Sequence, residues 1–97
     1  MTLDEVKNIL ARHKRELAET YGVESLGVFG SFARGEEDER SDVDLLVEFG
    51  KPIGFVAFMR LERRLGEILG KRVDLVTKKA LKPHIGAIVL REVQYVR

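Results

Sequence analysis

The sequence predicts an α/β fold, with one small sheet covered by helices in a single domain over residues 1–97. Three observations favour this class. Apolar residues recur at helical spacing in separate segments, short apolar runs of strand length lie between them, and no linker or internal repeat divides the chain. A chain of this length can bury one modest core but has no room for separate substrate and catalytic domains. The expected order is helix, strand, loop, strand, helix, strand, helix.

The first third of the chain contains a helix and a strand. Apolar side chains repeat at helical spacing over residues 3–17, and Thr2 with Glu5 can form a capping box at the start. This helix is expected to end near residues 21–22. The stretch "ESLGVFG" that follows is predicted to be a strand whose apolar side chains share one face.

The remaining chain alternates strands and helices. "DVDLLVEF" is predicted to be a second strand, "KRVDLVT" a third, and "HIGAIVLREV" a last helix before a short tail. Between the second and third strands, a long amphipathic helix is expected to end at Gly70. We interpret its apolar stripe as core, formed by Phe55, Phe58, Leu61, Leu65 and Ile68.

Charge is distributed unevenly, although the formal net charge is only +1. Seven carboxylates lie between Glu36 and Glu48, whereas basic residues predominate between Arg60 and Lys82. Such a chain could hold cations in one place and phosphate in another, while most of these residues are interpreted as solvated surface. The net charge predicts no overall attraction to nucleic acid or membranes, and neither is an expected partner.

The chain has no cysteine, which excludes disulfides and thiolate metal sites. Its apolar runs are too short to span a bilayer, and the N-terminus lacks the apolar core of a signal peptide. We therefore expect a cytoplasmic protein.

Three aspartates form the candidate site. Successive residues of a strand point to opposite faces, so Asp42 and Asp44 point the same way with Cα atoms roughly 7 Å apart. On the third strand, the same alternation places Asp74 opposite the core face. If these strands are neighbours, the three carboxylates converge on one spot and suit Mg²⁺, which binds protein carboxylates together with substrate phosphates.

A Gly-Ser turn supplies the second half of the site. Gly30 ends the first strand and Ser31 begins a short helical turn, where backbone N–H groups and a hydroxyl can hold a phosphate. Arg34 is placed to meet a phosphate, or equally to form a structural ion pair. Phosphate binding beside a metal site is the minimum equipment for phosphoryl or nucleotidyl transfer.

The spacing of these two parts resembles a known signature. Gly30-Ser31, ten residues and then Asp42-Val43-Asp44 resembles the polymerase-β nucleotidyltransferase superfamily, and "GSFARGEEDERSDVDLLVEF" is similar in particular to its minimal (MNT) members. The order and length of the elements agree with that family from Leu3 to about Val93. The resemblance implies a nucleotidyltransferase fold with a small mixed β-sheet flanked by helices. It also implies transfer of AMP from ATP, with release of pyrophosphate.

The resemblance further implies roles for individual residues. Asp42 and Asp44 would hold two Mg²⁺ ions, and Asp74 would complete the metal site and help to deprotonate the acceptor hydroxyl. Gly30 and Ser31 would bind the triphosphate. Minimal members often act as antitoxins that modify a tyrosine of a HEPN-domain toxin with AMP. This chain has no HEPN domain of its own, so it would be the antitoxin half of such a pair.

Two other functions stay open at this point. The chain could be a non-catalytic binding module that neutralises its partner by occlusion, although a vestigial site would be expected to have lost a carboxylate. It could instead transfer a nucleotide to a small molecule, which would require an acceptor pocket from another chain. A homo-oligomer would provide such a pocket, and the sequence leaves the oligomeric state open.

Overall fold

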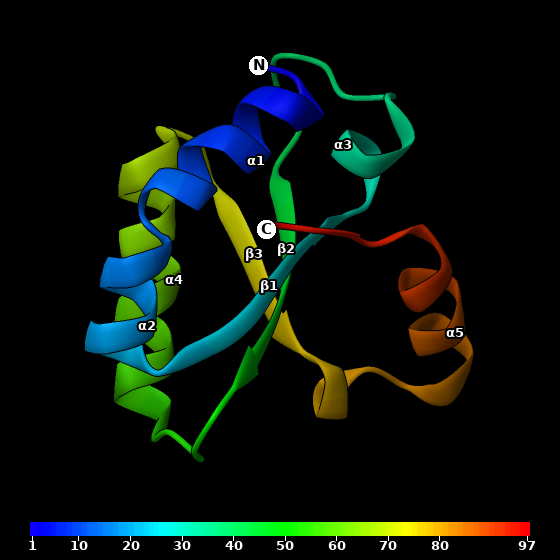
Figure 1. Cartoon of the computed structure of the whole chain (residues 1–97). Coiled ribbons are helices and arrows are strands. Elements are labelled where there is room, and N and C mark those ends of the chain that lie inside the picture. The colour runs from blue at the N-terminus through cyan, green and yellow to red at the C-terminus, as the bar shows by residue number, and fades with distance from the viewer.

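Four strands form one mixed sheet that lies between a group of three helices and the last helix of the chain (Figure 1). The computed structural model describes all of residues 1–97. In the sheet the order is β3-β2-β1-β4, with β2 and β3 parallel and β1 antiparallel to both β2 and β4. This architecture confirms the predicted class. The elements are α1 (Leu3–Arg12), α2 (Lys14–Tyr21), β1 (Val23–Phe29), α3 (Ser31–Arg34), β2 (Val43–Phe49), α4 (Phe55–Leu69), β3 (Val73–Thr77), a 3-10 turn η1 (Lys78–Ala80), α5 (Pro83–Glu92) and β4 (Gln94–Tyr95).

The main core lies on one side of the sheet. Figure 1 shows α1, α2 and α4 on this side and α5 on the opposite side. Alternate residues of β2, namely Val43, Leu45 and Val47, are fully buried here and belong to the same cluster as Leu61 and Leu65 of α4. Because alternate strand residues point to opposite faces, the aspartates out of phase with this set face away from the core.

Local sequence signals at the helix ends act as predicted. The Thr2 hydroxyl accepts a hydrogen bond from the Glu5 N–H at 3.3 Å, and the Glu5 carboxylate accepts one from the Thr2 N–H at 3.1 Å, which completes the capping box. Helix α4 ends where Gly70 adopts a left-handed conformation with φ of 66°. The predicted long amphipathic helix is therefore confirmed as α4, and so is its end at Gly70.

The N-terminal helix is divided, contrary to the prediction of one continuous helix. Helix α1 ends at Arg12 and α2 begins at Lys14, with the His13 N–H bonded to the Leu10 carbonyl in a tight turn. The apolar spacing continues through this turn, and neither Pro nor Gly marks it. Packing rather than local propensity therefore places the break, as α1 contacts α4 while α2 also contacts β1.

Two other expectations differ from the structure. Phe55 was expected in the core but is 78% exposed, because it lies at the start of α4, before the part of the helix that packs on the sheet. The tail forms β4, which pairs with Gly27 and Val28 of β1 and was not predicted. Two residues are too short to show an alternating pattern.

No helix has both the length and the apolar character needed to cross a membrane.

Candidate active site

The parallel pairing of β2 and β3 brings two of the predicted aspartates opposite each other. Asp44 and Asp74 are direct partners in the strand register. Asp42 lies immediately before β2, whose pairing begins where the Val43 N–H donates to the Arg72 carbonyl at 2.9 Å. The neighbouring strands that the sequence argument required are thus present.

The Asp44 carboxyl is half-buried among like charges. Burial is the main cause that raises the pKa of Asp44, and repulsion from Asp74 and then Asp42 raises it further. The positive charge of Arg34 opposes this shift, while the Glu92 carboxylate adds to it. The ionised form of Asp44 is therefore energetically unfavourable in the folded protein, and a bound cation would stabilise it.

Gly30 occupies the junction between β1 and α3 and lies directly against Asp44. Its backbone has φ of 74° and ψ of −151°, a combination that only glycine adopts readily. A Cβ at this position would overlap Oδ2 of Asp44. Close approach of the Gly30 backbone to the carboxylates is the reason for glycine here, and Ser31 follows as the first residue of α3.

A further acidic residue belongs to this site. Glu92, the last residue of α5, accepts a hydrogen bond from the Gly30 N–H at 2.9 Å. The same carboxylate pairs with the Arg34 guanidinium at 3.1 Å, and Arg34 also donates to Glu36 at 2.6 Å. Of the two roles considered for Arg34, the structure therefore contains the ion pair. Glu92 was not singled out from the sequence, since it lies 58 residues from Arg34 and carries no local signal.

The donor set fits a divalent cation without forming a finished metal site. No three His, Cys, Asp or Glu side chains are grouped closely enough to hold an ion as they stand. Nevertheless, Asp44 and Asp74 are aligned, Asp42 adds negative charge, and the missing Cβ of Gly30 leaves room for the Asp44 carboxylate beside the Gly30 backbone. All-oxygen donors of this kind suit Mg²⁺ that keeps other ligands from water or substrate phosphates.

These observations define a site suited to phosphoryl or nucleotidyl transfer. Comparison with known proteins agrees. A family model described as "Nucleotidyltransferase domain" matches residues 10–96. The protein adenylyltransferase MntA of Thermococcus cleftensis is 52% identical over 96 residues, which cover 99% of this chain and 97% of the relative.

Solved structures extend the comparison. A minimal nucleotidyltransferase structure matches with a TM-score of 0.80 at 37% identity and covers 97% of this chain and 95% of its own. A Shewanella oneidensis complex of an MNT antitoxin with a tri-AMPylated HEPN toxin matches with a TM-score of 0.67 at 17% identity, covering 94% and 71% respectively. The latter likeness is one of fold. The chain belongs to the nucleotidyltransferase domain family and is a nucleotidyltransferase.

Proposed function

We propose that this nucleotidyltransferase transfers AMP from ATP to a tyrosine hydroxyl of a HEPN-domain partner and so acts as the antitoxin of a toxin-antitoxin pair. The observation that carries this proposal is the alignment of Asp44 with Asp74 beside the Gly30 turn. The 52% identical relative is named a protein adenylyltransferase, which supports a protein as acceptor. The structurally similar complex, in which an MNT antitoxin is bound to an AMP-modified HEPN toxin, supports the partner class.

In this proposal each of the three aspartates and each residue of the Gly30 turn has a separate role. Asp42 and Asp44 would bind two Mg²⁺ ions, with Asp74 completing the site. Bound Mg²⁺ would supply charge neutralisation for the triphosphate and for the oxygens of the reacting phosphate. Gly30, Ser31 and Arg34 would hold the triphosphate tail through N–H, hydroxyl and guanidinium donors.

Transfer itself requires an in-line displacement. The acceptor oxygen attacks the α-phosphorus, the bond to the β-phosphate oxygen breaks, and pyrophosphate leaves. The acceptor must lose its proton in this step, and we assign the proton to the exposed carboxylate of Asp74. Because Asp74 is opposite Asp44 in the register, the base and the reacting phosphate would be adjacent.

The occlusion alternative has no comparable support from the structure. All three aspartates and the Gly30 turn are intact, whereas a module that only blocks its partner has no need for a half-buried carboxyl among like charges. A small acceptor would need a pocket that the aspartates themselves line, because it is too short to extend to them from a neighbouring groove. None of the three aspartates lines either of the grooves of about 540 and 550 Å³.

Thermal unfolding of the wild type and of Asp44→Asn tests the site without any acceptor. Because the ionised Asp44 carboxylate is strained by burial and repulsion, Asp44→Asn should raise Tm when no metal is present. Addition of Mg²⁺ with a non-hydrolysable ATP analogue should raise Tm for the wild type only. Equal increases in Tm for both proteins on addition of the ligand would show that Asp44 does not contribute to nucleotide binding.

A further inference from the structure

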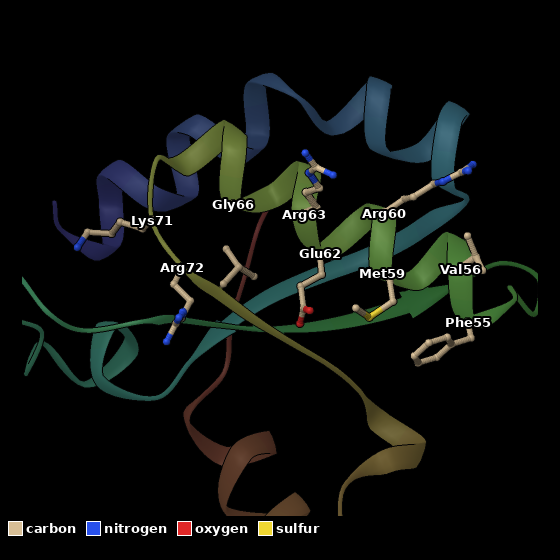
Figure 2. A pocket seen from close by; sticks show the side chains of 10 residues that line it. Phe55, Val56, Met59, Arg60, Glu62, Arg63, Gly66, Lys71 and Arg72 are labelled. Carbon is tan, nitrogen blue, oxygen red and sulfur yellow. The ribbon is translucent and has the colours of Figure 1, made fainter.

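A groove beside the candidate active site lies between the outer side of α4 and the start of β3 (Figure 2). Its volume is about 540 Å³, which is enough for a few side chains of a ligand. The groove is lined by Phe55, Val56, Met59, Arg60, Glu62, Arg63, Gly66, Lys71, Arg72 and Val73. Apart from the Arg72 carbonyl, which accepts the Val43 N–H, none of these residues takes part in the site described above.

Positive charge dominates the lining. Arg60, Arg63 and Arg72 are exposed and form no ion pair within the protein. By contrast, the neighbouring Arg64, outside the groove, is held by Glu16 at 2.7 Å. Unpaired guanidinium groups gathered at one groove favour an anionic ligand with carboxylates or phosphates.

The single carboxylate in the lining has a structural partner. Glu62 accepts a hydrogen bond from the Leu75 N–H of β3 at 2.9 Å and forms no ion pair with the arginines, so four cations face one carboxylate in the lining. Strand β3 is at the edge of the sheet, and this contact occupies one of its free N–H groups. Because Glu62 blocks strand addition at this point, a ligand would be recognised through its side chains.

The opposite end of the groove is apolar. Phe55, Val56 and Met59 on the first turns of α4 are 78%, 62% and 48% exposed. Figure 2 shows Phe55 and Met59 at one end and Lys71 and Arg72 at the other. An exposed apolar cluster next to unpaired cations is typical of a protein-binding surface.

The basic end of the groove lies close to the candidate active site. Arg72 precedes Asp74 by two residues, so their Cα atoms are roughly 7 Å apart along the strand. From the Cα atom of Val73 to that of Thr77, β3 spans roughly 13 Å, the length of five extended residues. Asp74 faces away from α4, but β3 is the edge strand, so a short peptide segment that passes around this edge could present one side chain to Asp74 while its other end contacts the apolar cluster.

We propose that this groove binds the acceptor segment of the protein substrate, as an acidic stretch with an apolar residue about four positions from the acceptor tyrosine. This inference rests on the proposed function and adds a specificity surface to it. Arg60 and Arg63 recognise the acidic residues by charge complementarity, and Phe55 with Met59 contacts the apolar residue. A nucleic acid is less well matched, because Phe55 is the only aromatic side chain in the lining and no row of rings is present for base stacking.

Binding of fluorescent heptapeptides tests the surface independently of catalysis. One peptide carries tyrosine, glutamates and a leucine four positions on, and its matched control carries lysines in place of the glutamates. The wild type should bind the acidic peptide more tightly, with an affinity that falls as salt is added. Arg63→Glu should weaken acidic-peptide binding by about fivefold or more and strengthen lysine-peptide binding. Arg12→Glu, an exposed arginine on α1 outside the groove, should change neither.

The same peptides separate the failure of this inference from that of the proposed function. Peptide binding is measured without nucleotide, and Asp44→Asn should retain it. In transfer assays with ATP, Arg63→Glu should raise the KM for the acidic tyrosine peptide and leave kcat unchanged. Phe55→Ser, at a position too exposed to support the core, should also weaken peptide binding. Equal affinity for the two peptides, or tighter binding of an RNA heptamer that Arg63→Glu abolishes, would overturn the inference.

Discussion

Glu92 and Arg34 form an ion pair at 3.1 Å beside the Gly30 turn, and the Glu92 carboxylate also accepts a hydrogen bond from the Gly30 N–H. One side-chain anion thus occupies two donors that we assign to the triphosphate tail. A nucleotide that uses these donors must displace Glu92 from the end of α5.

Glu92→Gln is therefore expected to bind an ATP analogue about fivefold more tightly, because a neutral amide competes less well than a carboxylate for N–H donors. The measurement is a calorimetric titration in the presence of Mg²⁺. Glu36→Gln is the matched control, since Glu36 also pairs with Arg34 but does not contact Gly30, and it should have the smaller effect. Weaker binding by Glu92→Gln would instead mean that Glu92 orients Arg34 for the nucleotide.

Gly30→Ala should lose both stability and nucleotide binding. The new Cβ would overlap Asp44 Oδ2, and the backbone has a conformation that alanine adopts only with strain. Gly22→Ala provides the control, because Gly22 has a similar φ of 72° but open space around it. That control should cost roughly 1–2 kcal/mol in urea unfolding and leave nucleotide binding intact. Equal losses in the two variants would show that contact with Asp44 is unimportant.

Acid should weaken the link between α2 and α4. Hydrogen bonds from Arg64 and then His13 lower the pKa of Glu16 from 4.5 to about 2. Since the folded state has the lower pKa, the stabilisation is present above about pH 4.5 and is lost as the pH falls towards 2. Glu16→Gln should reduce the fall in Tm over this range, whereas Glu19→Gln, which removes only an exposed pair with Arg15, should not. An unchanged acid profile in Glu16→Gln would contradict this account.

Strand alternation was sufficient to predict that Asp44 and Asp74 lie out of phase with the core residues of their strands. Because Val43, Leu45, Val73 and Leu75 are core residues, the phase of both strands follows from the sequence, and the structure aligns Asp44 with Asp74 as that phase requires. The adjacency of the two strands was an assumption that only the structure confirms. The capping box of α1 and the end of α4 at Gly70 could also be predicted from the sequence, since their signals are local.

Features that depend on contacts between residues far apart in the chain could not be predicted from the sequence. Glu92 reaches the Gly30 turn through the return of the chain along α5, and no motif near residue 92 indicates this. The break at His13 and the exposure of Phe55 depend on which elements the helices contact in the folded protein. Apolar periodicity describes which face of a helix is buried but not how far along the helix the burial extends.

The most direct test of the account is a transfer assay with ATP labelled at the α-phosphate, Mg²⁺ and a purified HEPN-domain partner. Wild-type protein should place label on a tyrosine of the partner, and chelation of the metal should stop the reaction. Asp44→Asn should reduce transfer by more than the roughly 10- to 100-fold that is typical when a second-shell contact to a metal ligand is lost. Transfer that persists undiminished in Asp44→Asn, or a wild type that binds the partner tightly without labelling it, would contradict the central claim.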